Sequence, residues 1–149
     1  YELQRELNRD VIVLFSDVVA HKNLIDSCVN SVDDFNLIVD LDSKKESTMR
    51  VIISEDSIIG VGNYIKPKNA SGNFIGIAKI STGGLKLLNP TISNLVKNEK
   101  FHNKYYTKGI DHLAKNNTQI GYSLTDGLFW CEVDNESDYG WLKKNFPIN

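Results

Sequence analysis

Several features that mark specialised protein classes are scarce in this sequence. It has two cysteines, Cys28 and Cys131, which lie far apart and have no neighbouring Cys or His at metal-ligand spacing. The pattern therefore predicts neither a disulfide framework nor a zinc site, and we expect two reduced thiols in a cytoplasmic protein. The longest aliphatic or aromatic run is VIVLF, residues 11–15, far short of the roughly 20 apolar residues that a membrane-spanning helix needs.

Charge of one sign is not in excess either. The chain has 17 Lys and Arg against 19 Asp and Glu, a formal net charge of −2, and its lysines are scattered. Since nucleic-acid binding leaves a clustered basic footprint, we expect neither nucleic acid nor a membrane as a partner. The 149 residues, 41% of them hydrophobic, are enough for a single domain with a real core, spanning residues 1–149.

Segments typical of strands and helices alternate along the chain. The apolar run at 11–15 has no polar interruption, which indicates a central strand buried on both faces. Residues 35–42, FNLIVDLD, repeat that design, and Leu24, Ile25 and Cys28 between the two runs are spaced as in a short amphipathic helix. This repetition is typical of βαβ units. It predicts an α/β fold with a mixed, mostly parallel sheet flanked by helices.

The middle of the chain is more broken. Residues 49–62 are predicted to form a hairpin, residues 74–81 a strand, and STGGLK at 81–86 a turn. Asn89 followed by Pro90 predicts the start of a helix, because Asn caps helices and Pro is tolerated in the first turn. A further helix is predicted from the spacing of Tyr106, Ile110, Leu113 and Ala114.

A strand over 128–134 and a closing helix complete the prediction. Asn135 can cap that helix, with Asp138 near its positive end and Tyr139 and Leu142 facing inward. Side chains two apart on a strand share a face, so Glu132 and Asp134 would project together from the end of the strand.

Acidic residues close several of the predicted strands. Asp17 follows the first run, Asp40 ends the second, and Asp134 ends the last. Carboxylates held at neighbouring strand ends can ligate Mg²⁺, which prefers oxygen ligands and commonly bridges a protein carboxylate to substrate phosphates. An Asp after a strand is also a common turn former or helix cap, and for any one of them taken alone that is the commoner reading.

The sequence resembles the nucleotidyltransferases of the nucleoside-diphosphate-sugar pyrophosphorylase-like superfamily. The resemblance covers nearly the whole chain and is closest to the branch that makes CDP-activated phosphocholine or phosphonates, including domains joined to phosphoenolpyruvate mutase. It is carried, in the expected order, by DVIVLFSDVV, FNLIVDLD, VGNYI, GNFIGIAKIS and WCEVDNESDYGWLKKNF. It implies a Rossmann-like nucleotidyltransferase fold and the transfer of a nucleotidyl group from a nucleoside triphosphate, with CTP expected, to a phosphorylated or phosphonate acceptor.

The resemblance also implies roles for individual residues. In the family, the Asp closing the central strand and the Asp of the late E-x-D motif hold Mg²⁺, and the matching positions are Asp17 and Asp134. The family's acceptor segment G-E-F-I-G-I reads GNFIGI here, so Asn73 replaces the usual Glu and Gly76 is the second glycine. Asn63 stands where the family often has a lysine.

The identity of the acceptor is left open by the sequence. Tyr122, Trp130 and Tyr139 surround the acidic strand end in sequence, and aromatic faces beside a carboxylate such as Glu132 suit an ammonium group. Phosphocholine or an aminophosphonate would then fit, although Trp130 and Tyr139 are equally well explained as core residues. Neutral hydrogen-bonding side chains, Asn63 and Asn73, favour a sugar phosphate instead.

One motif of the family is missing. These enzymes begin with a strand and a G-x-G-x-R loop that grips the nucleotide, and the chain has no match to it. We therefore expect the chain to be the C-terminal part of a nucleotidyltransferase domain, inactive alone and dependent on a preceding segment or a fused domain. The alternative is a non-catalytic α/β binding or scaffolding module.

Overall fold

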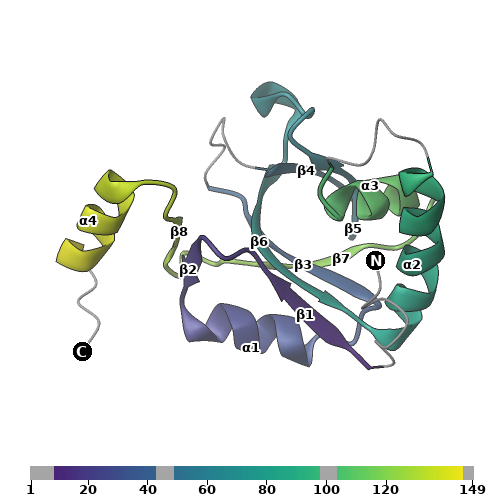
Figure 1. The fold of residues 1–149 in the computed structure, drawn as a ribbon, viewed down its shortest axis with the longest axis horizontal. Helices are drawn as coiled ribbons and strands as arrows, with labels where there is room; N and C mark the ends of the chain where they lie inside the picture. The colour runs from purple at the N-terminus through teal and green to yellow at the C-terminus, as the bar shows by residue number, and fades with distance from the viewer. Residues whose placement is uncertain (1–8, 43–48, 98–103, 146–149) are drawn as a thin grey trace.

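The computed structural model describes residues 9–42, 49–97 and 104–145 (Figure 1). Their helices and strands follow in the order β1 (Val11–Leu14), β2 (Val18–Ala20), α1 (Lys22–Asn30), β3 (Phe35–Asp40), β4 (Met49–Ser54), β5 (Ser57–Gly62), the 3-10 helix η2 (Pro67–Asn69), β6 (Gly72–Ile80), α2 (Thr82–Val96), α3 (Thr107–Lys115), β7 (Gly121–Leu124), β8 (Trp130–Glu132) and α4 (Glu136–Asn145). None of these helices is long and apolar enough to cross a membrane.

A six-stranded sheet forms the centre of the fold, in the order β5-β4-β6-β3-β7, with β1 also paired to β6. Helices flank it, so the predicted fold class, a mixed α/β sheet with flanking helices, is confirmed. The two strands β3 and β6 are buried along their whole length. Continuous apolar runs such as these are typical of strands covered on both faces.

The prediction of a mostly parallel sheet is wrong for the strand pairs. Strands β1, β3 and β4 all pair antiparallel with β6, and β7 pairs parallel with β3. Thus β1, β3, β4 and β7 run in one direction, as βαβ units require, but β6 runs the other way between them. Sequence periodicity reports burial and not pairing partners, so it could not reveal this insertion.

Strand β1 is not central, contrary to its sequence pattern. It pairs with the C-terminal half of β6, with Val11 opposite Ile80 and Leu14 opposite Ile77. Its side chains are half-buried or exposed, and Leu14 is 47% exposed. In the described residues β1 therefore lies at an edge of the sheet.

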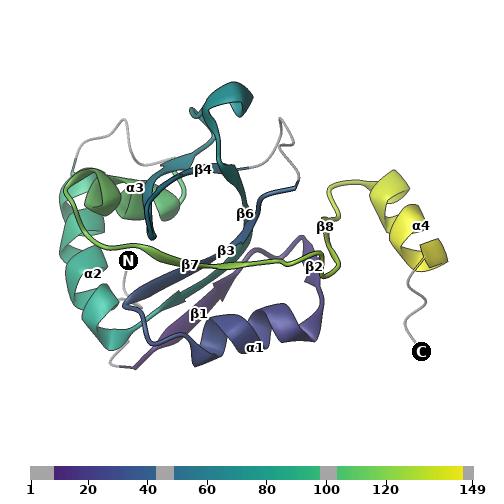
Figure 2. The same ribbon diagram turned by 180° about the vertical axis from the view of Figure 1, so that it is seen from behind.

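Two layers of helices cover the sheet, as Figures 1 and 2 show from opposite sides. Alternate residues of a strand face opposite ways. Accordingly, Phe35, Leu37 and Val39 of β3 join the core beneath α2 and α3. Ile38 joins a second cluster with Leu24 and Cys28 of α1.

Helix α2 begins earlier than predicted. Ser81 caps it by accepting a hydrogen bond from the Gly84 amide, and Pro90 lies inside the helix instead of opening it. STGGLK is therefore the cap and first turn of α2 and not a turn. The two glycines allow a close approach, because a Cβ on Gly84 would lie 2.3 Å from the Asp34 carbonyl oxygen.

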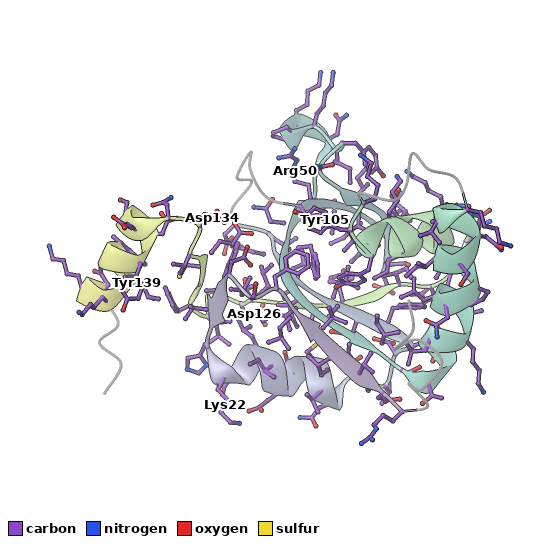
Figure 3. The ribbon with its side chains drawn as sticks, in the orientation of Figure 1. Lys22, Arg50, Tyr105, Asp126, Asp134 and Tyr139 are labelled. Atoms are coloured by element: carbon purple, nitrogen blue, oxygen red, sulfur yellow. The ribbon has the colours of Figure 1, made fainter. Side chains whose placement is uncertain are left out.

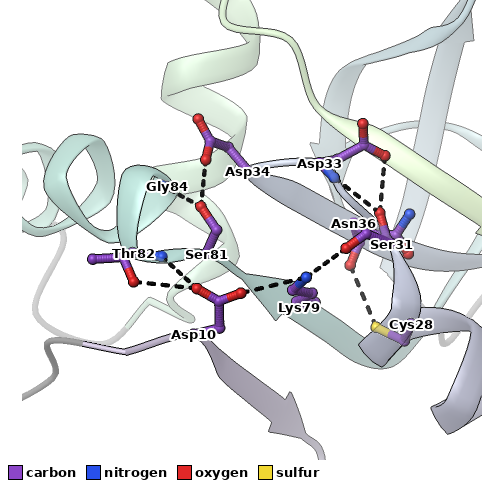
Figure 4. Close-up of polar contacts among 10 residues, drawn as sticks. All are labelled: Asp10, Cys28, Ser31, Asp33, Asp34, Asn36, Lys79, Ser81, Thr82 and Gly84. Atoms are coloured by element: carbon purple, nitrogen blue, oxygen red, sulfur yellow. Dashed lines mark hydrogen bonds and ion pairs between the residues drawn. The ribbon is translucent and has the colours of Figure 1, made fainter.

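A polar cluster ties the start of α2 to β6 and to the segment before β1 (Figure 4). Buried Lys79 donates a hydrogen bond to the Ser31 carbonyl and lies 3.4 Å from Asp10, whose carboxylate accepts a 2.9 Å hydrogen bond from the Thr82 amide. Ser81 donates to Asp34. We call Asp10, Ser31, Asp34, Lys79, Ser81 and Thr82 the polar cluster.

The segment predicted as one strand over 128–134 forms only β8, which pairs antiparallel with β2 in a separate two-stranded ribbon. Helix α4 follows it and extends away from the main sheet in both views (Figures 1 and 2). Asn135 caps α4 as predicted, accepting hydrogen bonds from the amides of Ser137 and Asp138. Leu142 is buried, but Tyr139 is 57% exposed, so its predicted inward orientation is wrong.

Candidate functional site

The β2–β8 ribbon brings Asp17 and Asp134 to the same end of the molecule. Val18 lies opposite Glu132, and the amide of Val133 donates a 2.8 Å hydrogen bond to the Asp17 carbonyl. In an antiparallel pair, the residue before one strand lies beside the residues after its partner. Two acids that are distant in sequence therefore become neighbours.

These acids line a pocket of about 510 Å³. Its wall includes Asp17, Glu132, Asp134 and Asn63, four of the residues predicted from sequence. The pocket lies where β1 and β4, which pair with opposite ends of β6, leave the middle of β6 without a strand on that side. Its remaining lining residues are Leu14, Phe15, Ser16, Met49, Phe74 and Tyr105.

The oxygen atoms of this pocket fit a hard divalent cation. Asp17 Oδ1 is buried and has no hydrogen-bond partner, which is costly unless something absent from the chain binds it. No three His, Cys, Asp or Glu side chains in the described ranges form a metal-binding group by themselves. Two carboxylates are nevertheless enough for Mg²⁺, which usually keeps waters and takes further oxygens from phosphate substrates.

Aromatic side chains form the floor of the pocket, a feature that the sequence analysis missed. The Phe15 ring makes an edge contact with Phe74 at 5.8 Å between centroids and a tilted contact with Tyr105 at 5.9 Å. Gly76 makes room for it: φ is +87° there, and a Cβ would lie 2.8 Å from Phe15 Cδ2. Gly76 therefore borders the pocket through Phe15, without lining it. Contacts between residues so distant in sequence leave no local signal.

Asp40 and Trp130 lie outside the pocket lining and bind each other. The indole Nε1 of Trp130 donates a 2.8 Å hydrogen bond to Asp40 Oδ2, while Asp40 Oδ1 accepts one from the Asp42 amide. The Trp130 ring packs against the α1 side of the core. This pair joins the β2–β8 ribbon to the end of β3, so it helps to position Glu132 and Asp134.

Asn73 is fully buried, and neither its side-chain oxygen nor its side-chain nitrogen has a hydrogen-bond partner. It lies on β6 between Arg50 of β4 and Asp40 of β3, which are its partners in register. Residues directly opposite on neighbouring strands share a face of the sheet. Asn73 therefore lies outside the pocket lining, as an unpartnered amide between a cation and an anion on neighbouring strands.

The remaining aromatic candidates lie away from the pocket. Tyr122 of β7 packs on the α2–α3 side of the core. Tyr139 lies on α4, beyond Asp134 and farther from Tyr105 (Figure 3). Neither lines the 510 Å³ pocket.

A second, smaller pocket of about 250 Å³ adjoins the first and shares Met49, Asn63 and Tyr105 with it. Lys104 and Lys108 are among its other lining residues. The sequence analysis did not single out these lysines, because no acidic or basic run marks them.

Next to this pocket, buried Asp111 joins α3 to β5. Its Oδ1 accepts hydrogen bonds from the Tyr64 hydroxyl at 2.6 Å and the Val61 amide at 3.2 Å, and Oδ2 pairs with Lys108 and Lys115. Burial by itself would raise the pKa of Asp111, but the hydrogen bonds from Lys108, Tyr64, Lys115 and the Val61 amide outweigh it and hold the pKa below its usual value. Asp111 is thus a charged, fully partnered structural residue.

Comparison with solved structures relates this fold to known proteins. The chain superposes on a CTP:phosphocholine cytidylyltransferase from Streptococcus pneumoniae with a TM-score of 0.68 and 16% identity, covering 97% of this chain and 60% of that one. The chain shares its fold. An inositol-1-phosphate CTP transferase from T. maritima gives a TM-score of 0.64 at 13% identity, covering 91% and 54%.

A third solved structure extends the comparison. A Bacillus anthracis protein assigned as a glucose-1-phosphate thymidylyltransferase, in complex with a sucrose, gives a TM-score of 0.66 at 12% identity, covering 99% of this chain and 59% of that one. The chain therefore spans between half and two thirds of the length of these structures. No protein-family model and no curated protein matches the sequence. The likeness to these three solved structures therefore establishes the fold alone.

Proposed function

We propose that the chain provides the metal-binding and acceptor-binding part of a nucleotidyltransferase. The reaction would transfer a nucleotidyl group from a nucleoside triphosphate, CTP by preference, to a phosphocholine-, aminophosphonate- or sugar-phosphate-type acceptor. The observation that carries the proposal is the single pocket lined by Asp17, Glu132 and Asp134 in a fold shared with nucleotidyltransferases.

In this proposal Asp17 and Asp134 hold Mg²⁺. When bound, the cation would offset the repulsion between the nucleotide phosphates and the anionic acceptor. The unpartnered Oδ1 of Asp17 gives it a ready ligand. The hydrogen bond from the Val133 amide to the Asp17 carbonyl and the Asp40–Trp130 pair keep the two acids in position.

The other pocket residues act on the acceptor. Glu132 and the faces of Phe15 and Tyr105 suit an ammonium group, which is attracted both by a carboxylate and by aromatic rings. The Asn63 side chain offers hydrogen bonds to hydroxyl or phosphate oxygens. No covalent protein nucleophile is required, because the acceptor's own oxygen would attack the α-phosphorus of the nucleoside triphosphate while the bond to the β-phosphate breaks and pyrophosphate leaves.

The nucleotide would need more protein than the 149 residues. The chain has no G-x-G-x-R motif and spans 54–60% of the length of the solved nucleotidyltransferases. We propose that a preceding segment or a fused domain binds the nucleotide, so that the 149-residue chain alone is inactive. We also propose a cytoplasmic location, where Cys28 and Cys131 would stay reduced thiols.

The metal site is tested by titrating Mg²⁺ calorimetrically into the chain and into the variants Asp17→Asn and Asp134→Asn. Asp126→Asn is the matched control, because Asp126 is exposed in a turn outside the pocket and its φ of +49° suits Asn. Each pocket variant should weaken Mg²⁺ binding at least tenfold, as expected for the loss of a charged ligand. Equal binding by all four proteins would disprove the metal site.

The reaction is tested with the natural polypeptide that contains these 149 residues. Transfer of labelled CMP from CTP would be followed with phosphocholine, 2-aminoethylphosphonate and glucose 1-phosphate as acceptors, with and without Mg²⁺. Transfer to one of them that requires Mg²⁺ and falls about 100-fold or more in Asp17→Asn would support the proposal. Absence of transfer from any nucleoside triphosphate would favour the alternative, a non-catalytic α/β binding or scaffolding module.

A further inference from the structure

We propose that the pocket of about 250 Å³ beside the acidic pocket is a subsite for a phosphoryl-type anion, with Lys104 and Lys108 as its cationic residues. Its lining combines these two lysines with Thr107 and Tyr64, and no Asp or Glu lies among the described lining residues. The assignment of this anion to a substrate rests on the proposed function. The binding of an anion does not.

The charges around the pocket leave a positive surplus. Asp111, which pairs with Lys108 of the pocket, is shared between two ammonium groups, Lys108 at 2.8 Å and Lys115 at 2.9 Å. Lys104 is exposed and forms no ion pair with any described carboxylate. Lys108 thus shares one carboxylate with Lys115, and Lys104 has none among the described residues, so an added anion beside Lys104 and Lys108 would be attracted to the unbalanced charge.

The start of α3 adds a second source of attraction. The helix spans nine residues, Thr107–Lys115, and no side chain caps its N-terminus. Its first two residues, Thr107 and Lys108, line the pocket. The amides of Lys108 and Gly109 donate to the Tyr105 and Tyr106 carbonyls, so the attraction at this end comes from the helix dipole, which is positive there and favours an anion.

The position of the pocket indicates which anion it would hold. Met49, Asn63 and Tyr105 line both pockets, so one substrate could extend from the acidic pocket into the basic one. Carboxylates on one side and lysines on the other separate two kinds of group: a cation between Asp17 and Asp134, and phosphoryl oxygens beside Lys104. Two substrates of the proposed reaction carry such oxygens, namely the acceptor and the triphosphate.

Inorganic phosphate tests the subsite directly. Binding would be measured by calorimetry with the complete chain, in EDTA and about 0.15 M salt, which screens weak surface attraction. Lys104→Gln should raise the dissociation constant about tenfold, as expected for one charge-assisted hydrogen bond. Lys104→Arg should restore binding. Lys86→Gln, at an exposed position on α2, is the control. Equal phosphate binding by Lys104→Gln and Lys86→Gln would overturn the subsite.

Lys104 is the better test residue because it forms no hydrogen bond or ion pair with another described residue, whereas Lys108→Gln would also disturb Asp111. Competition experiments then identify the source of the anion. Displacement of phosphate by phosphocholine assigns the subsite to the acceptor, and displacement by a non-hydrolysable CTP analogue assigns it to the triphosphate. Displacement by neither overturns the assignment of the subsite to a substrate. The phosphate test requires neither Mg²⁺ nor transfer. Failure of the metal site with Lys104-dependent phosphate binding would therefore reject the proposed function alone.

Discussion

At the C-terminal end of β6, Lys79 is buried but donates to the Ser31 carbonyl and lies 3.4 Å from Asp10. At the N-terminal end of the same strand, Asn73 is more deeply buried and its amide has no partner at all. The first end belongs to the polar cluster of Figure 4. The second precedes Phe74, which lines the acidic pocket, although Asn73 itself lies outside that lining.

This difference separates a satisfied polar network from an unsatisfied amide along a single strand. A buried polar group without a partner costs about 1–3 kcal/mol, so a fold that gains nothing from it would lose it. Native structures leave few such groups, and those that remain call for an explanation. Asp17 Oδ1 belongs to a residue that lines the pocket, and it is explained if a ligand completes its hydrogen bonds. Asn73 lies outside the pocket lining, so its unpaired amide is a cost to the fold. The polar cluster needs no ligand, because its own residues satisfy one another.

The largest expected effect comes from adding a side-chain atom at Gly84, beside the polar cluster. In Gly84→Ala the new Cβ would lie 2.3 Å from the Asp34 carbonyl oxygen, and backbone must move, so we expect the free energy of unfolding to fall by about 3 kcal/mol. Gly140→Ala is the matched control, because Gly140 is in α4 with open space around it. It should gain about 0.5–1 kcal/mol. Urea denaturation measures both, and equal stability would contradict the packing described.

Asp111 extends the comparison to a third place, where a buried charge is fully partnered. Asp111→Asn keeps the shape but loses two ion pairs, and should lower the free energy of unfolding by about 2 kcal/mol at neutral pH. Because the pKa of Asp111 in the fold lies below the usual 3.8, this contribution is complete above pH 3.8 and is lost as the pH falls through the folded value. Urea denaturation would be measured across this pH range, and the free energies of unfolding of the unsubstituted chain and of Asp111→Asn should become equal in acid. A constant difference down to the lowest pH would refute the assignment.

The third prediction contrasts the two ends of β6 directly, by removing one polar side chain at each. Lys79→Met keeps the aliphatic stem but leaves the Ser31 carbonyl unpaired, at a cost of about 1.5 kcal/mol. Asn73→Leu removes an unsatisfied amide and should stabilise the fold by about 1 kcal/mol. Thermal and urea unfolding would be compared for both. If both variants are destabilised alike, the two ends of β6 do not differ as proposed.

The parts of the fold that local pattern determines were predictable. The buried runs that become β3 and β6, the hairpin of β4 and β5, and the apolar stripe of α3 follow from spacing alone. The start of α2 was missed because Asn89–Pro90 carries a stronger cap signal than Ser81–Thr82. The edge position of β1 was missed because it depends on which strands pair, and pairing is set by contacts between residues distant in sequence.

The residues of the candidate site also divide into those that the sequence predicted and those that it did not. Asp17, Glu132 and Asp134 were identified from acidic strand ends and from the family resemblance, and all three line one pocket. Phe15, Tyr105 and Lys104 were not, because an aromatic or a lysine has no distinguishing sequence context until folding brings it to a pocket wall. Trp130 and Asp40 were predicted from sequence to bind substrate, and in the structure they form a hydrogen bond with each other.

In the short ribbon of β2 and β8, the position of Asp17 relative to Asp134 depends on the register of the two strands. Side chains alternate between faces of a strand, so a slip of a single residue along either strand would turn one carboxylate to the opposite side. The fixed register of Val18 with Glu132 and of Ala20 with Trp130 excludes such a slip. Evolution could thus exchange side chains elsewhere on the cavity wall, such as Leu14, without moving the acids, while inserting or deleting one amino acid in this ribbon would separate Asp17 from Asp134.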